Sequence, residues 1–509
     1  MSAFQAAAAL LPIGLVVLLM AGLGWGAVAA GLAGGAAALP VALLVFGWQG
    51  PAAAGGLGGA LAGVAAEAGF SALTIIWVVA PALMLHEWQQ ANGGTEALRR
   101  ALLRLSADRG VTALLVAWFF ALFAEGAAGF GTPVVLAAPI LVGLGFPPAQ
   151  AVAMALVGHA VGVSFGAVGT PVVPQVAASG LDPLALSGAT ALLHAACGWA
   201  MALALRHMAG AASLRLALGA AFAFLLPFTA IALWVGPELP TLGGALIGGL
   251  AFAAALPRRR PAPEPRSRRP APEPGPTRRE MLAAVLPYLL LLGLILATRL
   301  LPPLRQALAG ATLDWSLAEG AFGGSVAPLY HPGTLLMASL LLAALWRRRR
   351  LSELGGAAAR ALVRLPAVLL ALLLMLGLAR LMVHSGMIAA LAQAAAGLAG
   401  AGWPVFAAAT GALGTFVTGS ATASNILLTD FQLATAAALS LPVLPLLAAQ
   451  GFGAAIGNII CPHNIVAGGA TVGLAGREGE VLRRTLPAAT LVVALGGALT
   501  LAAVAAWPG

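Results

Sequence analysis

The sequence predicts an all-α polytopic membrane protein with about 12–14 transmembrane helices and two re-entrant hairpins. Of its 509 residues, 61% are hydrophobic and only 8% are charged, whereas a soluble domain carries about 25% charged residues. Apolar runs of about 20 residues, each long enough to cross a bilayer as a helix, recur along the whole chain. The alternating strands of a membrane β-barrel are absent, so the spans are expected to be helical.

The charged residues indicate the topology of the chain rather than a nucleic-acid partner. All 26 basic residues are arginine, and they lie in short loops and one linker. Because cytoplasmic loops of membrane proteins are enriched in basic residues, these loops are expected to be cytoplasmic. Met1–Met20 has no basic region before its apolar stretch and is expected to be a membrane helix rather than a cleaved signal. Cys197 and Cys461 are too isolated to indicate a disulfide framework or a metal site.

The first half, residues 1–257, is expected to form an N-terminal transmembrane repeat. Its arginines cluster in Arg99–Arg109 and again in Arg206–Arg215, and both turns are expected to be cytoplasmic. Three spans precede the first cluster, which places the N-terminus outside. Spans are predicted near residues 4–24, 26–47, 60–85, 134–146, 185–205, 216–235 and 241–256.

A linker of different composition, Arg258–Glu280, follows the first half. It carries eight arginines and a near-repeat of R-R-P-A-P-E-P, which predicts an extended, solvated segment that cannot pack in a core. Its charge places it in the cytoplasm. We interpret it as a spacer between the halves; the alternative is a tether to lipid head groups.

The second half, residues 281–509, is expected to form a C-terminal transmembrane repeat that begins inside. Pro302–Pro332 is predicted to be an external loop, and Arg347–Arg350 a cytoplasmic stop. Arg477–Arg484 forms the last cytoplasmic patch, so the C-terminus is predicted outside. Spans are predicted near residues 281–301, 333–346, 361–383 and 486–507.

Each half contains one arginine-free block, residues 110–205 and residues 381–476, and each block has two glycine-rich interruptions. Broken backbone at membrane depth is tolerated only where it is packed in protein or lines a cavity. Paired interruptions in halves of opposite orientation predict an inverted-repeat secondary transporter, with its substrate between the halves. The interruptions are Glu125–Pro133, Val163–Pro174, Gly414–Asn425 and Gly451–Asn464, and the first and third are the predicted hairpin tips.

Glycines and small polar residues at these interruptions are the candidates for substrate binding. Glycine lets the backbone approach a ligand, and the helix start at Pro133 offers free N–H groups to an anion. Because neither block contains arginine, an anion would be held by N–H groups and hydroxyls. The alternative is that small residues only permit close helix packing. The candidates are Gly126, Gly129, Gly131, Thr132, Ser164, Thr170, Thr418, Gly419, Ser420, Thr422, Ser424, Asn425, Asn458 and Asn464.

Three ionisable residues near the interruptions, Glu125, His159 and His463, are the candidates for proton coupling. An acid within the membrane is costly to bury, and Glu125 could load and release a proton; alternatively, it holds its hairpin through hydrogen bonds. Imidazole titrates near neutral pH, although His159 could equally be a helix-packing residue. Structural roles are expected for His194, His384, Cys197 and Asp430.

The sequence lacks the signatures of several other classes. G-F-G-T-P is not a nucleotide-binding loop, because the Lys-Ser/Thr signature is missing. No catalytic triad with usable spacing and no metal cluster is evident. We therefore expect a protein that is not an enzyme and needs no cofactor or metal.

The interruptions resemble the lactate permease family, which includes glycolate permeases. In the first half the resemblance lies in A-E-G-A-A-G-F-G-T-P and its continuation (Ala124–Phe146) and in S-F-G-A-V-G-T-P-V (Ser164–Val172). In the second half it lies in Phe416–Asn425, Ile460–Ile465 and Gly473–Glu480. It spans nearly the whole chain and implies proton-coupled uptake of small 2-hydroxymonocarboxylates, such as lactate and glycolate, across a bacterial inner membrane. The sequence is also similar, more distantly, to carriers with re-entrant hairpins and an elevator motion.

Two positions depart from the pattern of that family. The family usually has an acidic or amide residue where this chain has Ala421. Where the family usually has Ser-Pro-Gln, this chain has the similar stretch Cys461-Pro462-His463. The hypothesis is that His463 takes over a proton role of the missing polar side chain. With the acid on the first tip only, coupling is assigned to Glu125, and the substrate oxygens are assigned to Thr132, Ser420, Thr422 and Asn425.

Two alternatives to a proton symporter remain open at this point. The first is a sodium-coupled carrier of another small organic anion, because unwound carbonyls can bind Na⁺. The second is a membrane-embedded enzyme that uses Glu125 and His463. The expected partners are a small monocarboxylate, a proton and the lipid bilayer, with no nucleic acid.

Overall fold

The computed structural model of the protein describes residues 3–19, 23, 25–106, 108–129, 131–210, 213–256, 274–347, 351–474 and 477–507. Ten helices in this part of the chain are long and apolar enough to cross a membrane, and six further apolar helices are shorter. The prediction of an all-α polytopic membrane protein is confirmed. The predicted 12–14 spans exceed ten because some of the shorter helices would also have to cross.

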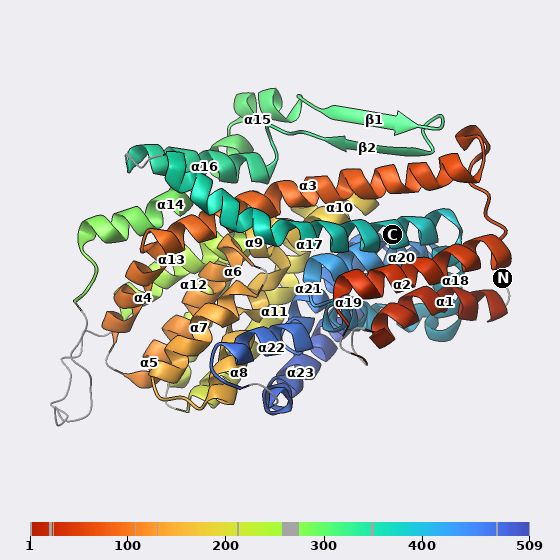
Figure 1. The fold of residues 1–509 in the computed structure, drawn as a ribbon. Helices are drawn as coiled ribbons and strands as arrows, with labels where there is room; N and C mark the ends of the chain where they lie inside the picture. Colours follow the sequence, from red (N-terminus) through yellow and green to blue (C-terminus); the bar gives the residue numbers. More distant parts are fainter. Residues whose placement is uncertain are drawn as a thin grey trace.

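The described residues of the first half form thirteen helices, several of which are joined directly or through short 3₁₀ or π stretches (Figure 1). They are α1 (Ala3–Val17), α2 (Ala27–Pro40), α3 (Leu57–Ala91), α4 (Gly94–Leu105), α5 (Arg109–Leu114), α6 (Ala121–Ala127), α7 (Thr132–Gly143), α8 (Pro148–His159), α9 (Gly166–Gly169), α10 (Val173–Ser179), α11 (Pro183–Ala209), α12 (Leu214–Trp234) and α13 (Pro240–Ala255).

In the second half, the part of the chain that the structure describes adds ten helices and a two-stranded sheet. They are α14 (Arg278–Leu300), α15 (Pro302–Ala309), β1 (Leu313–Leu317), β2 (Phe322–Val326), α16 (Pro332–Trp346), α17 (Leu351–His384), α18 (Met387–Ala399), α19 (Pro404–Thr418), α20 (Ala421–Leu439), α21 (Val443–Gly457), α22 (Pro462–Ala470) and α23 (Glu478–Ala505).

Two long helices from different halves, α3 with 35 residues and α17 with 34, run side by side (Figure 1). At 1.5 Å per residue each is roughly 50 Å long, well over the roughly 30 Å hydrocarbon core of a bilayer. Ion pairs join them near both ends. Nε of Arg360 lies 3.1 Å from Oε2 of Glu87, and Nε2 of His384 lies 2.9 Å from Oε2 of Glu67.

The predicted external loop, Pro302–Pro332, contains structure that the sequence analysis did not anticipate. β1 and β2 pair antiparallel, with Leu317 opposite Phe322, and lie along α3 (Figure 1). The Phe322 ring packs where Gly63 of α3 has no side chain, and the N–H of Gly323 donates to Oε1 of Glu67 at 3.3 Å. The hairpin is stabilised by these contacts with α3, so the sequence of the loop alone does not predict it.

Two broken segments are surrounded by protein. The most apolar stretches of Arg109–Ala127 and of Pro148–Ser179 are entirely buried within the described structure. Because irregular backbone in a membrane needs such shielding, these segments can hold turns at membrane depth. The predicted span near 134–146 is the 12-residue helix α7, which is too short to cross a bilayer that needs about 20 residues.

The linker meets the folded part of the chain at α14. Thr277 caps this helix, and its backbone N–H donates to Oε2 of Glu280 at 2.7 Å. Nη1 of Arg100 on α4 donates to the carbonyl of Pro274 at 3.1 Å. The predicted linker residues 258–273, the stop residues Arg348–Arg350 and Phe130 of the first interruption lie outside the described residues.

Candidate functional site

The first predicted hairpin is a helix–turn–helix whose tip contains two glycines in the left-handed region. α6 leads into the tip and α7 leads away from it. Gly129 has φ +57° and Gly131 has φ +77°, a conformation that residues with a Cβ rarely adopt. At the base, the guanidinium carbon of Arg109 lies 3.9 Å from the centre of the Phe146 ring. The chain therefore returns to the level at which it entered.

The second predicted hairpin has the same form. α19 ends at Thr418, Gly419 turns the chain with φ +78°, and Ser420 begins α20 by accepting a hydrogen bond from the N–H of Ala423. At the base, the indole N–H of Trp403 donates to Oε1 of Gln432 at 2.7 Å. Both hairpins therefore close on themselves and present a glycine turn at their tips.

Each hairpin is followed by a broken helix. In the first break, Ala167, Val168 and Gly169 are all left-handed, with φ values of 43°, 56° and 80°. Two non-glycine residues in this region cost about 1–2 kcal/mol each, and such strain is concentrated at functional sites. In the second break the chain leaves α21 at Gly457 and re-enters a helix at Pro462. The predicted interruptions in both blocks are thus present as breaks in helices.

Side chains join the four interruptions across the two halves. Oε2 of Glu125, on the first hairpin, lies 3.9 Å from Nε2 of His159, which lies 3.3 Å from Oδ1 of Asn458 in the second break. Nδ2 of Asn464 donates to the carbonyl of Asn458 at 3.2 Å, and a Cβ on Gly131 would lie 3.4 Å from Oδ1 of Asn464. The first tip therefore packs on the second break.

The second tip reaches the first break in return. Nδ2 of Asn425 on α20 donates to the carbonyl of Pro171 at 2.8 Å. Val163 of the first break packs with Ala421 of the second tip in a small buried apolar cluster. The interruptions that lie far apart in sequence therefore meet in one region.

The hydrogen bonds of His159 define a proton position. Its Nδ1 lies 2.7 Å from the carbonyl of Ala155; a carbonyl only accepts, so Nδ1 carries a hydrogen. In the neutral ring Nε2 is then an acceptor, yet it faces the oxygens of Asn458 and Glu125. A proton on the Glu125 carboxyl, or an Asn458 amide turned to present its NH₂ group, would give Nε2 a donor. Both side chains of the Glu125–His159 pair are at least 95% buried, so the pair is shielded from bulk water.

Several candidate residues have partners in the surrounding protein, and one of these contacts, from Ser164 to Gly451, joins the two halves. Gly126 lies against the backbone of Leu242 on α13. Oγ of Ser164 lies 2.8 Å from Nε2 of His194 and donates to the carbonyl of Gly451. The hydroxyls of three other candidates donate to backbone carbonyls close by, and these are Thr170, Thr418 and Ser424. These groups hold the breaks and tips in place.

Two further candidates lie at the second tip and its neighbouring break. His463 is exposed, and its Cβ lies 3.3 Å from the position a Cβ would take on Gly419. Thr422 is buried on the first turn of α20. His463 therefore lies beside the second tip rather than in the buried Glu125–His159 pair.

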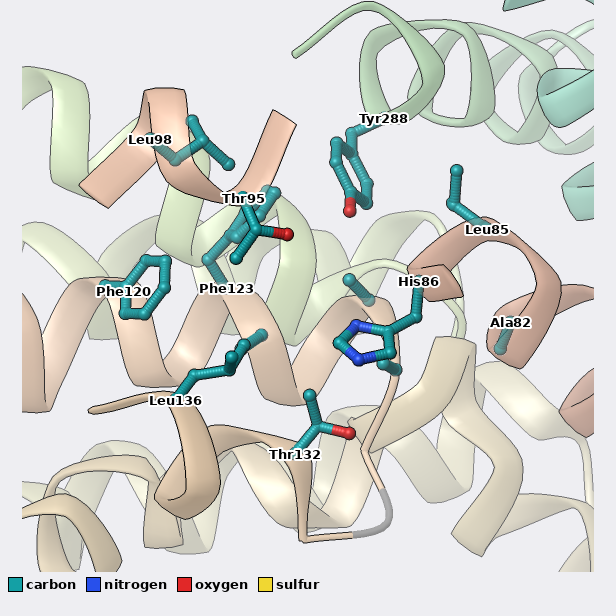
Figure 2. A pocket seen from close by; sticks show the side chains of 13 residues that line it. Ala82, Leu85, His86, Thr95, Leu98, Phe120, Phe123, Thr132, Leu136 and Tyr288 are labelled. Carbon is teal, nitrogen blue, oxygen red and sulfur yellow. The ribbon is translucent and has the colours of Figure 1, made fainter. Parts of the chain in front are cut away.

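A small cavity opens beside the first tip, with Thr132 on its floor (Figure 2). His86 of α3 and Tyr288 of α14 face it from the opposite side, and Thr95 of α4 lines another wall. It has a volume of about 20 Å³, room for roughly one water molecule. In this conformation the cavity is closed to any larger ligand.

Sequence reasoning missed residues that contribute to this region from outside the interruptions. His86 and Tyr288 lie in segments that were taken only as spans, although L-H-E-W-Q-Q at the end of α3 is a polar cluster that could have indicated His86. Gln450 of α21 is fully buried and donates to Oδ1 of Asn425 at 3.4 Å. Its Oε1 has no hydrogen-bond partner among the described residues.

The chain matches the family profile described as L-lactate permease over residues 5–506. It belongs to the L-lactate permease family. It is 30% identical over 370 residues to an L-lactate permease of Streptococcus iniae, covering 70% of this chain and 77% of the relative. It is 29% identical over 447 residues to a putative L-lactate permease of Haemophilus influenzae (81% and 84% covered). It is 27% identical over 482 residues to the glycolate permease GlcA of Escherichia coli (84% of both).

Two solved transporter structures are also similar. The YdaH transporter of Alcanivorax borkumensis has a TM-score of 0.49 at 19% identity, covering 88% of both chains. MtrF of Neisseria gonorrhoeae, from a class of antimetabolite efflux pumps, has a TM-score of 0.48 at 18% identity, covering 86% of this chain and 81% of that one. Membership of the L-lactate permease family makes this chain a membrane transporter rather than an enzyme.

Replacing Asn425 tests whether this side chain is structural or binds substrate. Asn425→Ala leaves the carbonyl of Pro171 without its buried donor, so we expect a loss of about 1–3 kcal/mol of stability, measured as a lower melting temperature in detergent. Asn92→Ala, which removes a local amide–carbonyl bond at the end of α3, is the matched control. An unchanged melting temperature with a raised KM for substrate would instead make Asn425 a substrate ligand.

Proposed function

We propose that the protein is a proton-coupled symporter that carries small 2-hydroxymonocarboxylates, such as lactate or glycolate, across a bacterial inner membrane. The relatives named as lactate and glycolate permeases support this substrate class. The proton coupling in this proposal is supported by the buried pair of Glu125 and His159, two ionisable side chains 3.9 Å apart near the contact with Asn458 of the second half.

In this proposal the first hairpin tip carries the proton, and the second tip contributes most of the contacts to the substrate. Glu125 carries the proton and His159 shares it, and the contact of His159 with Asn458 links this proton to the opposite half. The substrate oxygens bind between the two tips, through the hydroxyls of Thr132, Ser420 and Thr422. His463, beside the second tip, is a further proton site open to water.

Electrical balance determines what drives uptake. One proton that moves with one monoanion transfers no net charge. The membrane potential, worth about 2.3 kcal/mol per charge per 100 mV, therefore does not drive uptake, whereas a pH gradient does.

The arginine positions support a topology of two inverted halves. With the linker in the cytoplasm and both termini outside, the base of the first hairpin, at Arg109 and Phe146, faces inside. Residues 440–442 and the base of the second hairpin at Trp403 then face outside. Residues 1–257 and 281–509 would form the two repeats, with 258–280 as the linker.

Uptake of labelled lactate into proteoliposomes tests the proposal. An inside-alkaline gradient is expected to accelerate entry and to cause transient accumulation above the external concentration. A valinomycin-imposed membrane potential at equal pH is expected to have little effect. Acceleration by a sodium gradient with no response to pH would establish the sodium-coupled alternative and overturn proton symport.

A further inference from the structure

A second cavity lies beside α20, the helix that follows the second tip. It is enclosed by α3, α10, α17 and α20, and Ser325 of β2 contributes to its rim. Its volume is about 70 Å³; because a water molecule needs roughly 10–15 Å³ by this measure, the cavity holds several waters or a small organic acid. Two charged residues face it, Arg380 from α17 and Asp430 from α20.

Arg380 differs from Arg299 of α14 and Arg360 of α17, which are paired with carboxylates. Arg299 contacts Glu238 at 2.5 Å and Arg360 contacts Glu87 at 3.1 Å. For Arg380, no described residue accepts a hydrogen bond from the guanidinium or lies within ion-pair distance, although it acts electrostatically on Asp430. A charge placed within a membrane helix and left without a direct partner marks a substrate path.

Asp430 lines the cavity and lies on α20, the helix that leaves the tip of the second hairpin. It lies on α20 with Ile426, which also lines the cavity, and Ile426 follows Asn425, the residue that contacts Pro171 of the first break. Along α20, Asp430 is about 13 Å from Ala421 at the tip. A ligand in this cavity is therefore close to the region where the interruptions meet.

The charges around the cavity suit a ligand with one anionic and one hydroxyl group. Glu67 and His384 also face Asp430, but they are paired with each other, and Glu67 accepts from the β2 residue Gly323. Arg380 and Asp430 remain with unused hydrogen-bonding groups. A guanidinium binds a carboxylate with a two-pronged fork, and an ionised aspartate only accepts hydrogen bonds.

We propose that this cavity is an anion-binding vestibule in which Arg380 binds the carboxylate of a 2-hydroxy acid and Asp430 accepts a hydrogen bond from its 2-hydroxyl. The proposal rests on the proposed function, which makes such an acid the substrate. An acid that lacks the hydroxyl leaves Asp430 unpaired, and sites of this kind reject such analogues strongly. The vestibule thereby selects the substrate before it reaches the hairpin tips.

Residues of α3 line both the vestibule and the cavity beside the first tip. Phe70, Ser71, Thr74 and Ile75 of α3 line the vestibule, and Ala82, Leu85 and His86 line the cavity beside the first tip. These two groups of residues are about 17 Å apart along the helix. The two cavities therefore lie at different levels along α3.

Arg380→Gln tests the carboxylate contact in proteoliposomes. Since hydrogen bonds to charged groups contribute more than neutral ones, we expect the KM for lactate to rise about 10- to 100-fold, with acceleration by an inside-alkaline gradient retained at saturating lactate. Arg305→Gln is the matched control, because it removes one positive charge from α15, whose residues do not line the cavity; its KM should stay at the wild-type value. An unchanged KM in Arg380→Gln overturns the vestibule proposal.

Asp430→Asn tests the hydroxyl contact. Propionate is lactate without the 2-hydroxyl, so the ratio of lactate to propionate as competitors of labelled lactate measures recognition of that group. We expect the wild type to prefer lactate and Asp430→Asn to reduce the preference at least tenfold. A preference that persists in Asp430→Asn shows that the hydroxyl is recognised elsewhere.

Thr74→Cys provides a measurement that does not require Arg380 to be replaced. Thr74 is partly exposed on the cavity wall, whereas the native Cys197 and Cys461 are buried. Lactate is expected to slow labelling of this thiol by a small methanethiosulfonate, with propionate much less effective. No protection by lactate overturns the proposal even if Arg380→Gln does not fold. A wild-type protein that transports no lactate would instead remove the proposed function itself.

Discussion

Glu125→Gln is expected to abolish accumulation of lactate driven by a pH gradient while exchange of internal for external lactate continues. Glutamine keeps the shape of the side chain but cannot gain or lose a proton. The carrier could then still change conformation with substrate bound, but it could not couple that movement to proton flow. Parallel measurements of accumulation and of exchange in the same proteoliposomes separate the two effects.

The control for this experiment removes a carboxylate elsewhere. Glu319 lies in the exposed turn between β1 and β2, and Glu319→Gln should accumulate lactate like the wild type. His159→Gln is expected to impair accumulation as well, because His159 is the neighbour that shares the proton. Wild-type accumulation in Glu125→Gln would exclude this residue from the coupling mechanism.

Gly453→Leu is expected to prevent the second half from folding. A Cβ at Gly453 would lie 1.8 Å from the carbonyl oxygen of Ala408 on α19, so any side chain forces the two helices apart. Gly453→Ala already overpacks this contact and should cost about 1–3 kcal/mol or more. Size-exclusion chromatography of the detergent-solubilised protein, with heating before injection, would show the lost or lowered melting transition.

A glycine without close neighbours should behave in the opposite way. Gly397 lies in the helix α18, and a Cβ there would meet nothing within 4 Å. Because alanine favours a helix over glycine by roughly 0.5–1 kcal/mol, Gly397→Ala should leave the melting temperature unchanged or raise it slightly. Equal losses at both positions would show that the α19–α21 contact is looser than the structure has it.

The membrane architecture was predictable because the lipid bilayer restricts which backbone structures can cross it. Apolar length determines a transmembrane helix, and glycine-rich, polar interruptions cannot continue one, so the spans and the breaks follow from local sequence. The β1–β2 hairpin could not be predicted in the same way. Its stability comes from contact of Phe322 with Gly63 and of Gly323 with Glu67, residues more than 250 positions away.

The candidate site was predictable in part for a similar reason. Glu125 and His159 stand out as ionisable residues in apolar sequence, and the structure places them 3.9 Å apart. The sequence also suggested that Asp430 is structural and drew attention to the absence of arginine in the blocks. Arg380 lies immediately before the second block, and only the packing of α17 against α3 and α20 shows that it faces the same cavity as Asp430.

The paired ends of α3 and α17 have a mechanical consequence. The Glu67–His384 and Glu87–Arg360 contacts are about 30 Å apart along α3, and sliding the helices by a single turn would break both at once. The two helices are therefore expected to keep a fixed position relative to each other during transport. We therefore expect the displacement that carries a substrate to occur in the hairpins and broken helices, and cross-linking α3 to α17 to leave the transport cycle intact.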